Sequence, residues 1–410
     1  MQSESPTAER AVRHDEEPLL DVTDLSVEFE TSAGAVQAVN GIDLTIAPNE
    51  TLGVVGESGS GKSVTALSLL RLLEGSANVS GEARFRGEDL LSKPEAEMED
   101  VRGNSISMVF QDPGSSLNPV LTVGDQISET IRTHRSPPGE GITRRERNVM
   151  GNLFRSKRSF RRFEESWDRT VELFERVGIP LPEQRALEYP HEFSGGMKQR
   201  ALIAMAISCQ PDLLIADEPT TALDVTIEAQ ILELIDELQS EFGTAVLFIT
   251  HDMGVVRKVC DRVAVMYAGS VVENAPTEEL FEQPKHPYTE SLLRSVPRLD
   301  GTDELDPLSG SVPDLTQLPS GCPFAPRCPA ENDACHTAFP PAYSVTAGSE
   351  PLPVTAREAD GDAVTDVPPG RRETATDHLV NCVLYGDADH LTARDPTGSR
   401  SDDRPEGVDR

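Results

Sequence analysis

The stretch Gly56–Ser63 constrains the fold of this 410-residue chain more than any other feature. It reads Gly-Glu-Ser-Gly-Ser-Gly-Lys-Ser and fits the pattern G-x-x-x-x-G-K-[ST], with an apolar strand predicted before it at Thr51–Val55 and a helix predicted after it over Ser63–Leu73. Glycines let such a loop curl so that its N–H groups point at phosphate oxygens, and the following helix adds positive potential. The expected phosphate contacts are Gly56, Glu57, Ser58, Gly59, Ser60, Gly61, Lys62 and Ser63, with Lys62 on the β- and γ-phosphates and Ser63 on Mg²⁺.

A second apolar strand, predicted at Leu213–Ala216, runs into two carboxylates, Asp217 and Glu218. Ligands of open α/β sheets bind at the carboxyl ends of the strands, so these side chains are expected beside the phosphate loop. There Asp217 would hold Mg²⁺ through water and Glu218 would polarise the attacking water. A helix predicted over Val225–Leu238 and a strand at Val246–Ile249 continue the alternation, which predicts an α/β fold with a mainly parallel sheet.

With these two motifs the chain resembles the ATP-binding cassette (ABC) ATPases, and the run Phe193–Arg200 makes the resemblance specific. It reads Phe-Ser-Gly-Gly-Met-Lys-Gln-Arg and is similar to the family's signature, usually L-S-G-G-Q, with Phe193 and Met197 in place of the commoner residues. The resemblance implies a P-loop ABC ATPase cassette. Its parts would be a parallel-sheet core, N-terminal antiparallel strands, an inserted helical subdomain and a small Cys-containing C-terminal extension.

The same resemblance implies roles for further residues. Gln111 matches the Q-loop glutamine, a ligand of Mg²⁺ and water, Asp224 matches the D-loop, and His251 matches the switch histidine. Phe29 is either the aromatic that stacks on adenine or a core residue of its strand. The signature residues Ser194, Gly195, Gly196 and Met197 would act on ATP held by a second cassette, identical or related, so that two ATP molecules lie between two subunits.

Around Gln111 the match narrows to the branch of dipeptide, oligopeptide and nickel importers. The segments that carry it are Val109–Pro119, His286–Thr289, Gly310–Leu315 and Leu318–Cys322. This implies an ATPase subunit at the cytoplasmic face of the cell membrane that works with two permeases and, indirectly, an extracellular solute-binding protein. Peptides are the expected cargo, with nickel or another solute such as sugar as alternatives. Two other readings are a soluble ABC ATPase acting on DNA or ribosomes, and a regulatory iron–sulfur protein that binds nucleotide without turnover.

Four cysteines gather late in the chain, at Cys322, Cys328, Cys335 and Cys382, with 5, 6 and 46 residues between them. Clustered cysteines in a cytosolic protein ligate metal more often than they form disulfides. Four thiolates suit an iron–sulfur cluster or zinc, and free thiols are the third alternative. In the peptide-transport branch, similar cysteines hold a [4Fe–4S] cluster. His336 and His378 lie nearby in sequence as bystanders.

Changes in composition suggest the domain boundaries. We expect a disordered tail at 1–17, a nucleotide-binding domain at 18–283, an extension at 284–387 with a loop at 340–377, and a disordered acidic tail at 388–410. The helical subdomain would span about 112–200. Within it, 132–169 holds 11 Lys and Arg against 5 Asp and Glu, a local +6 that either solvates a helix pair or contacts anionic lipid or an acidic permease loop.

The formal charge of the whole chain is −33. This excludes a general nucleic-acid binder, because neutralising phosphates needs a basic face. The start, Met1–Arg10, is polar, and no apolar run approaches the ~20 residues that span a membrane, so a soluble, cytosolic chain is expected. Only six of the 37 basic residues are lysine, which together with the acidity resembles proteins of salt-loving microbes such as haloarchaea.

Overall fold

The structure is a computed structural model. It describes residues 17–32, 34–73, 75–134, 157–221, 223–295, 310, 313–345, 352–353 and 378–385, with side chains for all of these except 157–163 and 352–353. Several expectations lie outside the described residues: the N-terminal tail up to residue 16, the C-terminal tail, most of the loop at 340–377, and residues 135–156 of the basic insert.

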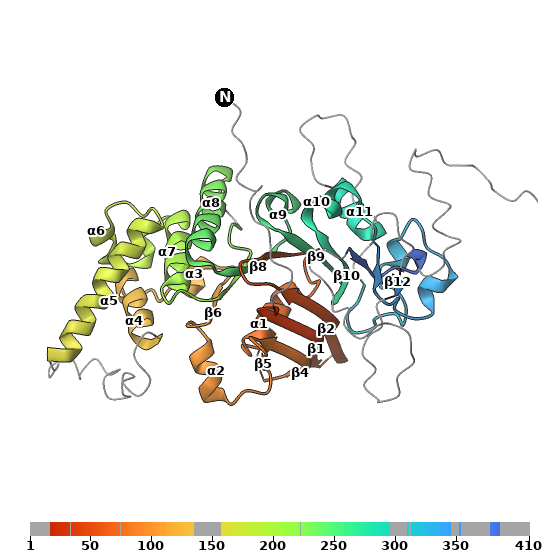
Figure 1. Ribbon diagram of the computed structural model, residues 1–410, viewed down its shortest axis with the longest axis horizontal. Helices are drawn as coiled ribbons and strands as arrows, with labels where there is room; N and C mark the ends of the chain where they lie inside the picture. Colours follow the sequence, from red (N-terminus) through yellow and green to blue (C-terminus); the bar gives the residue numbers. More distant parts are fainter. Residues whose placement is uncertain are drawn as a thin grey trace, which may run out of the picture.

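A nine-stranded sheet forms the centre of the molecule, in the order β12-β11-β13-β10-β9-β3-β8-β7-β6 (Figure 1). Its strands are β3 (Thr51–Val55), β6 (Ile106–Val109), β7 (Leu213–Asp217), β8 (Ala245–Thr250), β9 (Arg262–Tyr267), β10 (Ser270–Pro276), β11 (Tyr343–Ser344), β12 (Leu352–Pro353) and β13 (Leu379–Val380). The five strands from β9 to β6 pair in parallel, and β10 to β13 are added antiparallel. The carboxyl ends of the parallel strands therefore share one edge.

A second, antiparallel sheet has the order β2-β1-β4-β5. Its strands are β1 (Leu20–Thr31), β2 (Gly34–Ile46), β4 (Ala77–Phe85) and β5 (Glu88–Asp89). The mixed architecture of parallel core and N-terminal antiparallel strands agrees with the predicted fold class.

The two large clusters of the core lie one on each face of the central sheet, because successive strand residues point to opposite faces. A small third cluster holds Val380, Cys382 and Tyr385. On β7, Leu213 and Ile215 belong to the cluster beneath the antiparallel sheet, whereas Leu214 and Ala216 belong to the cluster that packs against the helices. Every residue of β7 is buried. This two-sided burial explains why the strand reads as an uninterrupted apolar run.

The helices fall into three groups (Figure 1). Against the central sheet lie α1 (Lys62–Leu69), α8 (Val225–Phe242), α9 (Met253–Val259) and α10 (Thr277–Glu282), and α2 (Glu95–Val101) follows the antiparallel sheet. A helical lobe at one end holds α3 (Pro113–Ser116), α4 (Val123–His134), α5 (Lys157–Arg176), α6 (Pro182–Ala186) and α7 (Gly195–Ile207). The C-terminal extension, with α11 (Pro287–Arg294), lies at the other end. No helix in the described ranges has both the length and the apolar character to cross a membrane.

The predicted strand at Thr51–Val55 has these bounds in the structure, but the helix after the phosphate loop is shorter than predicted. It ends at Leu69, not Leu73, because Arg71 takes a left-handed conformation with φ 51°. The N–H of Leu72 then donates to the carbonyl of Leu67 and turns the chain away. The leucine spacing continues past the turn, so periodicity alone overstates the helix.

Candidate active site

The phosphate loop joins β3 to α1 in a conformation that needs its glycines. Gly56 has φ +156° and Gly61 has φ +100°, values that side chains disfavour. A Cβ on Gly56 would lie 2.2 Å from the carbonyl oxygen of Met266, and one on Gly61 would lie 2.4 Å from that of Ala38. The loop is therefore pressed against β2 and β9, and no larger residue fits at these two positions.

Lys62, the first residue of α1, turns its ammonium into the loop. Its Nζ donates to the carbonyl oxygens of Gly56 at 2.8 Å and Glu57 at 2.9 Å. Burial lowers the pKa of Lys62, whereas the nearby carboxylates, led by Glu218 and Asp217, raise it. The ammonium of Lys62 is thus held inside the loop by carbonyl oxygens, in a position to bind an anionic ligand.

The next residue, Ser63, connects the loop to β7. Its hydroxyl donates to Oδ1 of Asp217 at 3.0 Å, although the two residues are 154 positions apart. Asp217 is 4% exposed, and burial raises its pKa while the bond from Ser63 lowers it. A hydroxyl and a carboxylate at one point are oxygen donors of the kind that Mg²⁺ prefers.

Glu218 lies one residue beyond β7 with φ 47°, a strained conformation for a non-glycine residue. Its carboxylate accepts hydrogen bonds from Nε2 of Gln111 at 2.7 Å and from the hydroxyl of Thr221 at 2.9 Å, and lies 3.1 Å from Nδ1 of His251. Burial raises the pKa of Glu218, but these bonds and the charge of His251 outweigh it and hold the pKa below its usual value. The predicted Gln111, Glu218 and His251 thus meet at one point.

The signature residues belong to the helical lobe, away from the phosphate loop. Ser194 caps α7 and accepts from the N–H of Met197 at 3.3 Å, while Ser194 and Gly195 are exposed. Gly196 leaves no room for a side chain, because its Cβ would lie 2.8 Å from Ile227 on α8. The N-terminus of α7 is therefore fixed in place with its polar end open.

Two other predicted residues have structural contacts of their own. Asp224 caps α8 and accepts from the N–H groups of Thr226 at 3.1 Å and Ile227 at 3.0 Å. Phe29 is half-buried near the end of β1 and packs against the cluster beneath the antiparallel sheet. This contact agrees with the strand-core reading of Phe29 and leaves the adenine role untested.

Sequence reasoning missed several contacts of the site. Thr221 on Glu218 is one, and the extension supplies the others: Arg327 forms an ion pair with Glu57, and the N–H of Glu57 donates to the hydroxyl of Tyr288 at 3.0 Å. Tyr288 was noted only as part of a motif, and a single arginine 270 positions from its partner shows no local pattern. The clustering of Cys322, Cys328 and Cys335 is the sequence signal that points to a function for this segment.

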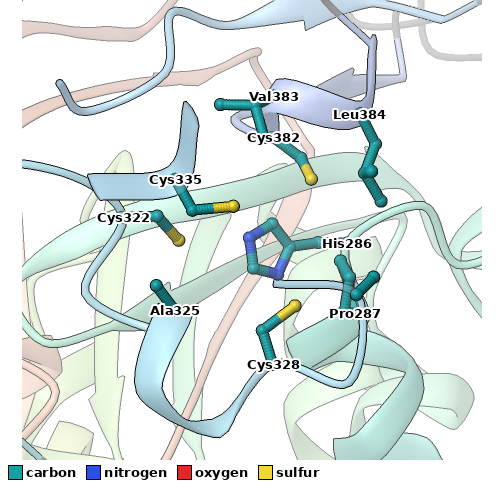
Figure 2. Close-up of a pocket in the computed structure, with 10 residues that line it drawn as sticks. His286, Pro287, Cys322, Ala325, Cys328, Cys335, Cys382, Val383 and Leu384 are labelled. Carbon is teal, nitrogen blue, oxygen red and sulfur yellow. The ribbon is translucent and has the colours of Figure 1, made fainter. Parts of the chain in front are cut away.

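The four late cysteines line one cavity of about 10 Å³ together with His286 (Figure 2). Figure 2 shows the imidazole of His286 in the middle of the four thiols. Burial raises the pKa of Cys322 to about 11 and that of Cys382 to about 12, and it lowers the pKa of His286 to about 4. Without a cation Cys322 and Cys382 are therefore protonated thiols and the imidazole of His286 is neutral.

The four cysteines are side chains of the type that bind a metal cluster, but in the structure they are not spaced to hold a metal ion. Four cysteines from separated stretches converge as thiols rather than as disulfides. Yet no three His, Cys, Asp or Glu residues in the described ranges are spaced to hold a metal ion, and the cavity is no larger than one water. His336 pairs with Glu331 at 2.8 Å and His378 with Glu273 at 2.7 Å, so both are engaged elsewhere.

Two family models match the chain. The ABC transporter model matches residues 39–221, and the model for the oligopeptide/dipeptide transporter C-terminal region matches residues 272–335. The first match contains the phosphate loop, the signature and Glu218. The second contains Tyr288, Arg327 and three of the four clustered cysteines.

Curated relatives cover most of the chain. A Brucella ovis protein, provisionally named a peptide import ATP-binding protein, is 50% identical over 343 residues, 80% of this chain and 94% of that protein. The oligopeptide transport ATP-binding protein OppD of Salmonella typhimurium is 48% identical over 323 residues, 78% of this chain and 89% of that one. OppD of Haemophilus influenzae is 47% identical over 322 residues, which cover 78% of this chain and 92% of that one.

Solved structures match the cassette. The ATP-binding cassette MJ0796, described as a dimer in a post-hydrolysis state bound to ADP and phosphate, has a TM-score of 0.52 at 25% identity, covering 63% of this chain and 98% of that one. CbiO1 of Clostridium perfringens, part of an ABC transporter complex, has a TM-score of 0.50 at 27% identity. The match covers 65% of this chain and 92% of that one.

Proposed function

The chain belongs to the ABC transporter family, as an ATP-binding subunit of its oligopeptide and dipeptide importers, and from this membership we propose that it hydrolyses ATP to drive peptide import through a membrane transporter. The reaction is ATP + H₂O → ADP + phosphate. The main support for the proposal is that Gln111 and His251 both contact the carboxylate of Glu218, next to a phosphate loop.

Each site residue has a role in this reaction. The N–H groups of Gly56–Ser63 and the ammonium of Lys62 bind the phosphates, and Ser63, Asp217 and Gln111 would hold Mg²⁺. Glu218 accepts a proton from the attacking water, for which its low pKa keeps it ionised at neutral pH. His251 lies against the same carboxylate and orients it. Asp224 stabilises α8. Phe29 packs against the core cluster beneath the antiparallel sheet and is the candidate aromatic residue for stacking on adenine.

We propose that the working unit contains two cassettes. At the N-terminal end of α7, where Ser194 and Gly195 are exposed, a hydroxyl and N–H groups lie in the helical lobe, away from the phosphate loop of the same chain, so they suit ATP held by a partner cassette. The partner is a second copy or a relative. Two permeases and, outside the cell, a solute-binding protein complete the importer, which places this chain on the cytoplasmic face of the membrane.

We propose that Cys322, Cys328, Cys335 and Cys382 hold an iron–sulfur cluster, for which their convergence is the support. A bound cluster would cross-link the segment that holds Cys322, Cys328 and Cys335 to the segment that holds Cys382. Absorbance near 400 nm in anaerobically purified protein, lost in Cys328→Ser, tests this. Zinc in place of iron, or neither metal, would rule it out.

The charge of −33 supports a host with a salty cytoplasm. In molar salt the Debye length falls to about 3 Å, so distant carboxylates hardly oppose ATP binding. Comparing ATP hydrolysis in molar KCl and in dilute buffer tests this, and full activity in dilute buffer would argue against such a host.

Transport itself is tested in vesicles that contain the chain, both permeases and the partner cassette. ATP inside with binding protein and labelled peptide outside should give peptide uptake, and Glu218→Gln should abolish it. Uptake of nickel or sugar in place of peptide would assign a different cargo, and ATP hydrolysis without any uptake would remove the transport role.

A further inference from the structure

The cysteine-bearing extension contacts the phosphate loop directly, through Arg327. The guanidinium forms a two-point pair with the carboxylate of Glu57, with Nη1 to Oε2 at 2.9 Å and Nη2 to Oε1 at 3.0 Å. Nη1 also donates to the hydroxyl of Tyr267 at 3.1 Å. The side chain of Arg327 is only 6% exposed and that of Glu57 23%. A two-point pair shielded from water is a stronger and more directional contact than a surface ion pair.

The position of Arg327 is set from within the extension. It ends the 3₁₀ turn Ala325–Arg327, and Cys328 follows it directly. Its guanidinium lies over the rings of Tyr267 and Phe324, at 5.8 and 6.0 Å from the ring centres. Phe324 packs in turn against Tyr267 and Tyr288 with ring centres 5.3 Å apart in both pairs. Arg327 therefore packs on an aromatic cluster that joins two parts of the extension, α11 and the turn Ala325–Arg327, to β9.

Two other contacts tie the extension to the same loop. The hydroxyl of Tyr288 accepts from the N–H of Glu57 at 3.0 Å. The carbonyl of Leu315 accepts from the N–H of Gln37 on β2 at 3.2 Å, next to Ala38, whose carbonyl oxygen faces Gly61. Contacts from the extension thus hold the phosphate loop at Glu57, its second residue, and next to Gly61, its sixth.

Glu57 places a negative charge within a loop that must accept a triphosphate. The carboxylate also attracts Lys62, whose pKa it raises. Arg327 balances this charge and turns the carboxylate toward the extension. Without the arginine, Glu57 would repel the phosphates and compete with them for the Lys62 ammonium, and both effects weaken ATP binding without touching the hydrolytic residues.

We propose that Arg327 is a positioning residue of the nucleotide site: by holding the Glu57 carboxylate away from the phosphates, it couples ATP affinity to the docking of the cysteine-bearing extension. The coupling is reciprocal, so bound ATP also favours the docked extension. The proposal rests on the ATP site proposed above and adds a residue from outside the cassette to it.

The test measures Mg-ATP binding and hydrolysis in the full chain. Wild-type binding is measured first, because a chain that binds no ATP refutes the proposed function, and only a binding chain tests Arg327. Arg327→Gln should weaken ATP binding about tenfold while kcat stays within about twofold, within the range typical of coupling between sites. Arg327→Lys keeps the charge but not the two-point geometry, so its ATP affinity should lie between those of the wild type and Arg327→Gln.

A matched control and a second substitution separate positioning from folding. Arg294→Gln removes an exposed arginine that pairs with Glu290 at 2.6 Å on α11 and should leave ATP binding unchanged. Arg327→Gln combined with Glu57→Gln should recover most of the lost affinity, because no uncompensated carboxylate remains. If the double variant stays as weak as Arg327→Gln, the loss comes from a displaced extension and the proposal is wrong. Unchanged binding in Arg327→Gln overturns it as well.

Hydrogen exchange gives a readout that does not depend on activity. A non-hydrolysable ATP analogue should slow exchange of the backbone amides at 322–328 in the wild type and have no such effect in Arg327→Gln. Equal slowing in both proteins would show that the extension senses ATP by another route and would contradict the proposal.

Discussion

The side-chain amide of Gln111 donates a 2.7 Å hydrogen bond to the carboxylate of Glu218, across 107 positions of sequence. Gln111 lies between the end of β6 and the start of α3, where the chain enters the helical lobe. A shift of that lobe relative to the sheet would therefore act on the carboxylate that we propose faces the attacking water. The bond offers a direct route from the lobe to the chemistry.

Glu218→Gln should lower ATP hydrolysis at least about a hundredfold, because the amide cannot accept the proton of the attacking water. Binding of Mg-ATP should persist and the ATP-bound dimer should accumulate. Phosphate release, nucleotide binding and size-exclusion chromatography measure the three effects. Glu233→Gln, an exposed change on α8, is the control and should behave as wild type. Hydrolysis near the wild-type rate in Glu218→Gln would remove the assigned role.

Asp217→Asn should raise the Mg²⁺ concentration for half-maximal hydrolysis by roughly 10- to 100-fold, because it removes the carboxylate that meets the Ser63 hydroxyl. A titration of activity against free Mg²⁺ measures this, and EDTA should stop the reaction in both proteins. Asp212→Asn tests a carboxylate at the other end of β7, where it pairs with Arg86, and should not alter the Mg²⁺ requirement. Equal shifts in the two variants would count against a Mg²⁺ site at Asp217.

Gly61→Ala should destabilise the chain by at least about 2 kcal/mol, because the residue has φ +100° and its Cβ would lie 2.4 Å from the backbone oxygen of Ala38. Denaturant unfolding measures the loss. Gly75→Ala, where a Cβ meets nothing within 4 Å, should leave the stability unchanged. A Gly61→Ala protein as stable as Gly75→Ala would mean that the loop is not pressed on β2.

Glu273→Gln should cost about 2–4 kcal/mol of unfolding free energy. Glu273 is fully buried and accepts from the N–H groups of Lys285 at 2.7 Å and His286 at 2.9 Å, and its carboxylate lies 2.7 Å from Nε2 of His378. The amide group turns one acceptor into a donor that faces other donors. Glu278→Gln, on the exposed face of α10, is the control. Equal stability of the two variants would show that this cluster does not hold the extension in place.

Sequence patterns predicted the cassette well because its signals are local. The strand at Thr51–Val55 and the carboxylates at the end of β7 follow from short apolar runs and neighbouring motif residues, and all of them are buried or positioned by the sheet. The roles of Gln111 and His251 followed from the family's pattern rather than from spacing, and their shared contact with Glu218 was found only in the structure. The end of α1 was placed too late because leucines continue past it.

The extension could not be predicted in the same way. Its strand β13 has two residues and pairs with Glu273 and Asn274, more than a hundred positions earlier. Such a pairing depends on tertiary contacts and leaves no periodic pattern. The partner of Arg327 was hidden for the same reason, since the chemistry of a lone arginine becomes specific only through the carboxylate that the fold brings to it.

The pairing of β13 with β10 also bears on how the chain is made. Between the end of β10 at Pro276 and the start of β13 at Leu379, about a hundred residues must leave the ribosome, which takes roughly 5–20 s. Throughout that interval β10 presents an unpaired edge, the kind of surface onto which another strand adds. β13 thus covers this edge of β10, and chains that stop before it are expected to aggregate.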